Sequence, residues 1–315
     1  MAQDEQRMTI GWVGVGRMGF ALAQRLLDAG HDVSVYNRTR SKAEPLTAHG
    51  AKIVDRPVEL ADRDVVFVMV SASDDLEDVT IGPDGLLTAS VTPQVIVDTS
   101  TVSATVSGKI RRAADDRGSA FLAAPVSGSP KVVASGKLSF VVSGPRDTFD
   151  RVEPLFAELG RAATYVGDDE VARIVKICHN VFLGVVTQSM AEITVLAEKA
   201  GVDRAAFLAF LNDSVMGSTF SRYKSPAFVN LDFTPSFTPV LLRKDFDLGL
   251  ASARELGVSM PVAALAAELV TIAINTGHSA EDFATLLLEQ ARRSGLEMTP
   301  EDVEVDDGLG TTSDG

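Results

Sequence analysis

Lys176 and Asn180 are two residues of this 315-residue chain whose types and spacing could support chemistry. They stand four positions apart in the stretch 168–200, whose pattern is helical and contains no proline, so they share one helix face. Burying an ammonium group on an otherwise apolar face is costly, and burial lowers the pKa of a lysine. Such an amine can exchange a proton with a hydroxyl or carbonyl oxygen near neutral pH. A surface lysine whose stem lies along the helix is the alternative interpretation of these residues taken alone.

A glycine-rich segment near the start of the chain has the spacing of a dinucleotide-binding loop. Residues 10–19 read IGWVGVGRMG, which places G-x-G-x-x-G between a predicted strand and a predicted helix, with a second strand about twenty residues further on. The three glycines allow a tight turn, close approach of a pyrophosphate and close packing of helix on sheet. The pyrophosphate would lie at the helix N-terminus, where free amides and the helix dipole favour negative charge. The residues expected to contact the dinucleotide here are Gly14, Val15, Gly16, Arg17, Met18 and Gly19.

The turn after the second predicted strand indicates which dinucleotide is preferred. Enzymes that use NAD usually carry an acidic residue there, which accepts a hydrogen bond from the ribose 2′-hydroxyl. Residues 35–40 read VYNRTR and contain no acid. Arg38 could bind a 2′-phosphate through two hydrogen bonds from its guanidinium group, and Asn37 and Thr39 could donate further hydrogen bonds to the phosphate. We therefore expect NADP rather than NAD, the alternative being a solvated basic turn.

Composition and charge exclude several other classes of protein. The formal net charge of −14 argues against nucleic-acid binding, which requires a basic surface. No run of eighteen apolar residues predicts a membrane span, and the polar first residues do not resemble a signal peptide, so we expect a cytoplasmic protein. A single cysteine, Cys178, fits a reducing compartment. No known metal-ligand spacing is found, because the four histidines are scattered: His31, His49, His179 and His278.

The pattern of elements predicts an α/β N-terminal domain of Rossmann type, followed by an all-helical C-terminal domain that begins with a long helix. Short β-branched runs alternate with helical stretches in the first half, which implies a parallel sheet covered on both faces. The predicted strands are 9–15, 33–36, 65–70, 95–98, 120–123, 138–142 and 162–166. The predicted helices include 18–28, 42–48, 103–117, 147–159, 168–200, 204–212, 240–256, 261–275 and 280–292.

The expected domains follow from this change of pattern. Residues 1–8 are predicted to be a flexible N-terminus, 9–167 an NADP-binding Rossmann domain, and 168–298 a helical domain for substrate binding and oligomerisation. The tail 299–315 holds six acids and no base, so it is predicted to be disordered. The long helix is too apolar for exposure on all sides, and a second subunit could cover part of it. Its apolar residues expected to be buried are Val171, Ile174, Val175, Val181, Phe182, Val185, Val186, Ile193 and Leu196.

The chain from residue 10 to about 291 resembles the β-hydroxyacid dehydrogenase family, which includes 3-hydroxyisobutyrate dehydrogenases and tartronate-semialdehyde or glyoxylate reductases. The resemblance rests on five segments in the right order. One is the glycine loop. The others are DTST at 98–101, APVSGS at 124–129, KICHN at 176–180 and KD at 244–245. They resemble the family's D-x-S-T element, its A-P-V-S-G-G substrate loop, its K-x-x-x-N motif and its late K-D element. Each segment is modest evidence, but five in the right order are specific.

The resemblance implies an NADP-dependent oxidoreductase that interconverts a small β-hydroxy acid and its semialdehyde or keto form. Lys176 would be the general acid in reduction and the general base in oxidation, and Asn180 would hydrogen-bond the substrate. Ser127, Gly128 and Ser129 would hold a substrate carboxylate, although the family usually has a second glycine where this chain has Ser129. Thr101 and Lys244 would contact the cofactor. A homodimer or homotetramer is expected, and no metal.

Three other functions fit parts of the sequence. An imine reductase or another atypical carbonyl reductase could use the same scaffold, but such relatives generally lack the catalytic lysine. A decarboxylating sugar-acid dehydrogenase of the 6-phosphogluconate type is normally longer and has extra basic residues. A non-catalytic NADP-binding sensor would have no need of both Lys176 and Asn180. The identity of the hydroxy acid or aldehyde stays open.

Overall fold

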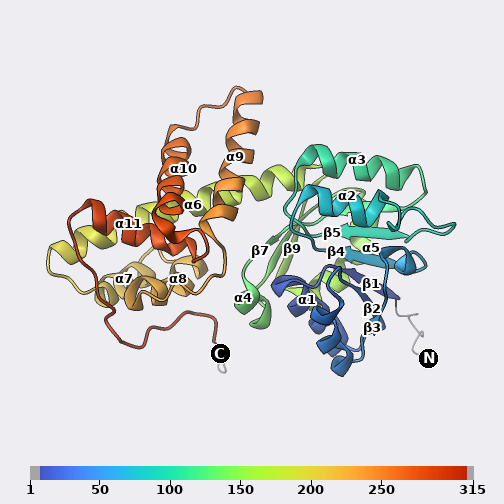
Figure 1. Ribbon diagram of the computed structural model, residues 1–315, viewed down its shortest axis with the longest axis horizontal. Helices are drawn as coiled ribbons and strands as arrows, with labels where there is room; N and C mark the ends of the chain where they lie inside the picture. Colours follow the sequence, from blue (N-terminus) through green and yellow to red (C-terminus); the bar gives the residue numbers. More distant parts are fainter. Residues whose placement is uncertain (1–7, 311–315) are drawn as a thin grey trace. The chain divides into compact units, whose positions relative to one another are not determined.

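The computed structural model describes residues 8–310, and the chain divides into two compact units, Met1–Lys176 and Ile177–Gly315 (Figure 1). The boundary falls inside the long helix α6 (Val171–Lys199) rather than at its start. The reason is that the first residues of α6 pack on the N-terminal unit, where Ala172 belongs to an apolar cluster. Most of the flexible N-terminus predicted from the sequence, residues 1–7, lies outside the described residues.

The N-terminal unit is built on one sheet, which confirms the Rossmann-type architecture. Its described strands are β1 (Ile10–Val13), β2 (Val33–Tyr36), β3 (Lys52–Ile53), β4 (Val65–Val68), β5 (Val95–Asp98), β6 (Ala120–Ala123), β7 (Val126–Ser127), β8 (Ser139–Ser143) and β9 (Ala162–Gly167). The strand order is β3-β2-β1-β4-β5-β6-β8-β7, and β9 pairs with β8.

The expectation of a wholly parallel sheet is wrong at one edge. The six strands from β3 to β6 are mutually parallel, but β8 is antiparallel to both β6 and β7. Between β7 and β8 the chain makes only the short helix α4 (Pro130–Ala134), and so short a connection favours an antiparallel return. Strand β9 then pairs parallel to β8.

Helices cover both faces of this sheet, as buried parallel strands require (Figure 1). Val65 and Phe67 point to the face covered by α1 (Arg17–Asp28) and α5 (Arg146–Leu159). Val66 and Val68 point to the opposite face, which α2 (Ser73–Ile81) and α3 (Ala104–Asp115) cover. Because successive side chains of a strand point to opposite faces of the sheet, the apolar residues of β4 contribute to the cores on both faces.

The regular elements of the C-terminal unit, among its described residues, are all helices. Besides the second part of α6 it contains α7 (Arg204–Asp213), α8 (Thr219–Asn230), α9 (Pro239–Glu255), α10 (Pro261–Ala273), a π-helical turn (Ile274–His278), a 3-10 turn (Phe283–Thr285) and α11 (Leu286–Arg293). The sequence pattern did not predict α8, which has Pro226 in its interior. A capping box between Ser218 and Ser221 fixes its start.

Two glycines let α6 and α9 approach closely within this unit. A Cβ atom added to Gly184 would lie 2.5 Å from the ring of Phe246, and one added to Gly249 would lie 2.6 Å from Val181. Larger residues at either position would push the helices apart. The close approach places residues of α9 opposite those of α6.

The acidic tail differs from the prediction of disorder. Residues 299–310 lie in defined contacts on the helical unit, while 311–315 lie outside the described residues. The Glu301 carboxylate accepts hydrogen bonds from the backbone amides of Arg204 and Ala205, at 2.7 and 3.0 Å, at the start of α7. Leu309 is buried. Acidic composition alone missed this, because the partners of the tail are a helix N-terminus and an apolar surface far away in the sequence.

Helix α6 is long and apolar enough to cross a bilayer by length and composition. Core helices of soluble proteins have the same properties, and half of its most apolar window is buried in the chain, so this is weak evidence for a span. The expected burial holds for Val181. Five others are exposed in the single chain: Val171, Val175, Phe182, Ile193 and Leu196.

Candidate active site

The glycine loop between β1 and α1 has the geometry that a dinucleotide pyrophosphate requires. Gly14 has a φ of +94°, and a Cβ there would lie 2.1 Å from the carbonyl oxygen of Met69. A Cβ on Gly19 would lie 2.1 Å from the carbonyl oxygen of Gly14, so this glycine permits the helix to pack on the loop. A Cβ on Gly16 would meet nothing within 4 Å. Gly16 is therefore open on its outer side, as expected where a ligand approaches the backbone.

The start of α1 also suits an anion. Its N-cap is Gly16, which has no side chain to cap the helix, and no acidic residue lies in the first turn. Backbone amides of the first turn and the positive end of the helix dipole are thus available to a negatively charged group. Gly16 and Arg17 are exposed, while Met18 is half-buried. These residues fit the pyrophosphate of a dinucleotide.

One residue of the turn after β2, Asn37, is hydrogen-bonded to the glycine loop. Asn37 accepts a hydrogen bond from the amide of Val15 at 2.7 Å through Oδ1, and its Nδ2 donates to the carbonyl oxygen of Thr39 at 2.8 Å. Asn37 thus joins β2 to the glycine loop, a role that the sequence analysis did not foresee. Arg38 is largely exposed, and its Nη1 lies 2.9 Å from Oδ1 of Asp75 at the start of α2. Asp75 is a charged neighbour of the expected 2′-phosphate site that the sequence analysis missed.

The loop 98–101 follows β5 at the carboxyl edge of the sheet. Asp98, Thr99 and Ser100 are buried, and Thr101 is half-buried. The hydroxyl of Ser100 accepts from the amide of Val70, just after β4, at 2.9 Å. The carboxylate of Asp98 accepts from the amide of Ser100 at 3.0 Å. These bonds hold the backbone that carries Thr101, the residue expected to contact the cofactor.

The predicted carboxylate loop lies between β7 and α4. Gly128 has a φ of +147°, a conformation that favours glycine, and Ser129 is the N-cap of α4. Gly128 is exposed, whereas Ser127 and Ser129 are half-buried. The two hydroxyl-bearing residues and the glycine between them are therefore adjacent at the surface of the N-terminal unit.

Lys176 and Asn180 are both buried on α6, with exposed fractions of 7% and 4%. Nδ2 of Asn180 donates to Oδ2 of Asp245 on α9 at 2.6 Å, and Asp245 is itself buried. Nδ1 of His179 lies 2.9 Å from Oδ1 of Asn180. The amide of Asn180 is therefore held at both ends, which fixes its orientation.

In the late K-D element the aspartate, rather than the expected lysine, contacts another site residue. Lys244, predicted as a cofactor contact, is 38% exposed, and its Nζ lies 3.7 Å from Oδ1 of Asp245. Asp245 is the buried member, and it contacts Asn180. From the sequence, the K-D element predicted Lys244, and not Asp245, as the site residue. His179, interpreted as a packing residue, also contacts Asn180.

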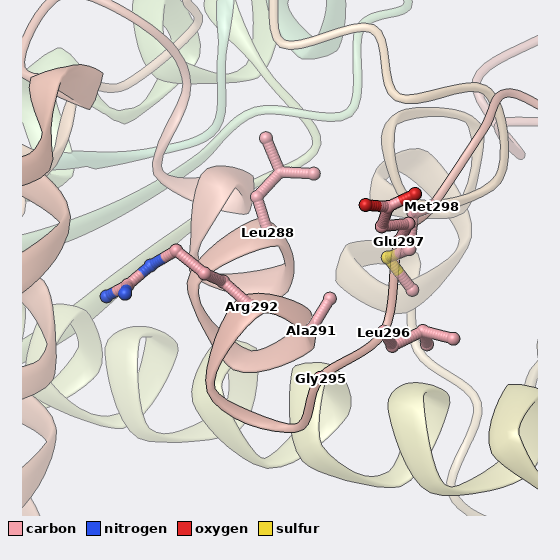
Figure 2. A pocket seen from close by; sticks show the side chains of 7 residues that line it. All are labelled: Leu288, Ala291, Arg292, Gly295, Leu296, Glu297 and Met298. Carbon is pink, nitrogen blue, oxygen red and sulfur yellow. The ribbon is translucent and has the colours of Figure 1, made fainter.

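A surface hollow near the end of α11 contains none of the predicted site residues (Figure 2). It measures about 380 Å³, and its walls are Leu288, Ala291, Arg292, Gly295, Leu296, Glu297 and Met298. Figure 2 shows the side chain of Arg292 reaching away from Glu297. Arg292 instead pairs with Glu289 at 2.8 Å. Among the described residues, no group of three or more His, Cys, Asp or Glu side chains could hold a metal ion.

The fold and the loop geometry define a dinucleotide-binding protein of the Rossmann type, and comparisons with known proteins identify its family. Residues 9–167 match the NAD binding domain of 6-phosphogluconate dehydrogenase. Residues 171–289 match a domain described as NAD-binding of NADP-dependent 3-hydroxyisobutyrate dehydrogenase. The first matched segment corresponds to the Rossmann unit, and the second corresponds to the long helix and the helical unit.

Individual relatives agree with these matches. Glyoxylate/succinic semialdehyde reductase 2, chloroplastic, from Arabidopsis thaliana is 32% identical over 281 residues, 89% of this chain and 78% of that protein. The 3-hydroxyisobutyrate dehydrogenase of Pseudomonas aeruginosa is 31% identical, over 88% of this chain and 96% of that protein. The solved structure of Mycobacterium tuberculosis 3-hydroxyisobutyrate dehydrogenase with L-serine has a TM-score of 0.79 at 27% identity, covering 90% of this chain and 99% of that one.

The chain belongs to the β-hydroxyacid dehydrogenase family. It is accordingly an NAD(P)-dependent oxidoreductase of the 3-hydroxyacid type. The resemblance inferred from five short segments is thereby confirmed at the level of the family and its general activity.

Proposed function

We propose that the protein is an NADP-preferring reductase or dehydrogenase that interconverts a short β-hydroxy acid and its semialdehyde or keto form. The observation that carries the proposal is the burial of Lys176 on the same helix face as Asn180, in a chain of this family. A buried amine beside a buried amide on one helix face is the kind of arrangement that an acid–base group requires.

Each residue then has a defined task. Lys176 delivers a proton to the carbonyl oxygen during reduction and takes it from the hydroxyl during oxidation. Asn180, held by Asp245, hydrogen-bonds the reacting oxygen and orients the substrate. The hydroxyls of Ser127 and Ser129, with the glycine between them, bind the substrate carboxylate. The bound nicotinamide nucleotide supplies or accepts the hydride.

The preference for NADP is supported by charge at the end of β2. No carboxylate occupies the turn 37–40, and Arg38 and Arg40 lie there. The guanidinium of Arg38 is exposed enough to bind a 2′-phosphate, with Thr39 beside it. The name of the matched C-terminal domain, which refers to an NADP-dependent enzyme, agrees with this preference.

A homo-oligomer assembled through the helical unit is part of the same proposal. Large apolar side chains are exposed on α6 and α10, among them Phe182, Leu196, Val262 and Leu265. Exposed apolar area of this kind marks an interaction surface, and closed homo-oligomers are the commonest way to cover it. Light scattering coupled to size-exclusion chromatography is expected to give a dimer or a tetramer, and a monomer at micromolar concentration would contradict this part.

The decisive experiment compares the wild type with Lys176→Ala on a panel of short aldehydes and keto acids. The panel contains glyoxylate, succinic semialdehyde, tartronate semialdehyde and methylmalonate semialdehyde, each assayed with NADPH and NADH. Lys199→Ala is the matched control, because Lys199 is an exposed lysine in the last turn of the same helix. NADPH binding is measured separately by fluorescence titration.

We expect turnover by the wild type to be faster with NADPH than with NADH. Lys176→Ala should lower kcat by about 10²–10⁴-fold, the usual contribution of a general acid, while NADPH still binds. Full activity of Lys176→Ala would remove the lysine from the mechanism. Tight NADPH binding without turnover on any panel member would favour an imine reductase or a non-catalytic sensor instead.

A further inference from the structure

Arg173, in the first turn of α6, is a buried charged residue that the sequence analysis did not single out. Its side chain is 1% exposed, and its ion-pair partner Asp98 is fully buried. Two charges removed from water are costly unless their geometry and additional hydrogen bonds compensate. The other hydrogen bonds of the Arg173–Asp98 pair therefore indicate its structural role.

The three nitrogens of the Arg173 guanidinium group reach three different partners. Nη2 donates to Oδ2 of Asp98, and Nη1 donates to the carbonyl oxygen of Ser100 at 2.6 Å. Nε donates to the hydroxyl of Ser107 on α3 at 3.1 Å. A planar guanidinium can make these contacts at once, whereas the single ammonium of a lysine cannot reproduce them.

The partners of Arg173 belong to the loop that carries Thr101. Asp98 and Ser100 lie in the loop 98–101, and they are already joined to each other by a hydrogen bond of 3.0 Å. Arg173 binds the side chain of one and the carbonyl oxygen of the other. The conformation of this loop therefore depends directly on the guanidinium group.

The same arginine is fixed relative to Lys176. The two residues are three positions apart on α6, and Asn180 is seven positions from Arg173. At about 100° per residue, all three lie on one face of the helix. Any movement of the first turn of α6 against the loop 98–101 would therefore move Lys176 relative to Thr101.

We propose that Arg173 is a positioning residue for the reaction: it locks the loop 98–101 to the helix that carries Lys176, so that the cofactor contact and the proton donor keep a fixed separation. This inference rests on the proposed function of Lys176. Arg173 acts through its contacts: it pairs with Asp98, and its Nε also lies 3.8 Å from Oε2 of Glu170.

A second arginine provides a matched control. Arg111 also holds the start of α6, because its Nε lies 2.6 Å from Oε1 of Glu170 and its Nη2 donates to the carbonyl oxygen of Asp169 at 2.6 Å. Its remaining hydrogen bond goes to the carbonyl oxygen of Phe121, and none of these three acceptors lies in the loop 98–101. Arg111→Lys thus perturbs the same helix end without disturbing the loop directly.

The test compares Arg173→Lys with Arg111→Lys in the full-length protein. Thermal unfolding, the Kd for NADPH by fluorescence titration, and the pH profile of kcat are measured for both. We expect Arg173→Lys to raise the NADPH Kd at least threefold, lower kcat at least tenfold and shift the pH profile. Arg111→Lys should lower the melting temperature and leave the other two quantities unchanged. Equal effects of the two variants on all three measurements would overturn the proposal.

Ser107→Ala keeps the test decisive if Arg173→Lys does not fold. It removes one acceptor of the guanidinium group and leaves the ion pair intact, so a twofold to threefold rise in NADPH Kd is expected. Wild-type Kd and kcat in Ser107→Ala would then count against the proposal. Failure of the proposed function is distinguishable, because it would be seen as undiminished activity of Lys176→Ala, whatever Arg173→Lys does.

Discussion

The side-chain amide of Asn180 donates to the carboxylate of Asp245 across 2.6 Å, although the two residues are 65 positions apart in the chain. Both are buried, with exposed fractions of 4% and 1%. A buried carboxylate accepts hydrogen bonds only, so it fixes which end of the amide faces it. Asp245 thereby orients the residue that we propose to hold the substrate.

Replacing Asp245 should impair turnover rather than cofactor binding. We expect Asp245→Ala to lower kcat by about tenfold or more, corresponding to ~1.4 kcal/mol of lost transition-state stabilisation, with little change in NADPH Kd. Asp247→Asn is the control, since Asp247 is exposed on the same helix and pairs with Arg243. Steady-state kinetics would contradict the role of Asp245 if both variants kept the wild-type kcat.

Alanine substitutions at two glycines of the loop should separate an effect on NADPH binding from an effect on protein stability. Gly16→Ala places a methyl group in open space, so the melting temperature of the free protein should stay unchanged while NADPH binds at least tenfold more weakly. Gly19→Ala forces a Cβ to within 2.1 Å of the carbonyl oxygen of Gly14, and should destabilise the protein by about 1–3 kcal/mol. Melting curves with and without NADPH measure both effects. Normal NADPH affinity in Gly16→Ala would show that the nucleotide does not approach there.

The Arg38–Asp75 pair predicts how the cofactor preference can be altered. A 2′-phosphate that binds Arg38 must compete with the Asp75 carboxylate, 2.9 Å away. Asp75→Asn should raise kcat/KM for NADPH by up to about fivefold, because an exposed ion pair contributes ~1 kcal/mol at most, and should leave the value for NADH unchanged.

Asp74→Asn controls for simple removal of negative charge. Asp74 and Asp75 both lie in the first turn of α2, but the contact with Arg38 is made by Asp75. A gain for NADPH of the same size in both variants would mean that the overall field, rather than the pair, sets the preference. A loss of NADPH activity in Asp75→Asn would mean that Asp75 holds Arg38 in place for the phosphate.

A second buried ion pair predicts how stability depends on pH. Nζ of Lys224 lies 2.6 Å from Oδ1 of Asp282, and both side chains are buried. Burial alone would raise the pKa of Asp282, but the charge of Lys224 and hydrogen bonds from Lys224, Ser236 and Ala284 outweigh it and lower the pKa. Because the folded-state pKa lies below the unfolded value, this stabilisation is present above the ordinary aspartate pKa and is lost as the pH falls through the folded-state pKa.

Asp282→Asn should therefore destabilise the protein by about 3–5 kcal/mol at pH 7, where it leaves the Lys224 ammonium buried without its counter-charge. The difference from the wild type should shrink as the pH falls below 3.8, the ordinary value for this group. Asp213→Asn, at an exposed position, serves as the control. Urea unfolding between pH 7 and pH 3 measures this, and a difference that does not change with pH would contradict the assignment.

The sequence alone was sufficient for features that depend on a few neighbouring residues. The strands β2, β5 and β6 have the predicted bounds, because β-branched and apolar runs between turns specify buried strands locally. The glycine spacing predicted a loop whose steric requirements the structure bears out at Gly14 and Gly19. The apolar helix face around Lys176 left two interpretations open, a buried and a surface lysine, and the structure shows it buried.

Tertiary structure alone decided the features whose partners are distant in the chain. The antiparallel pairing of β8, the contacts of the tail at Glu301, and the pairs Arg173–Asp98 and Asn180–Asp245 are not visible in any local pattern. Helix and strand periodicity report which face of an element is buried, but not which residue lies opposite. That choice depends on how the elements pack, and a buried polar group is satisfied by whichever partner the packing brings within hydrogen-bonding distance.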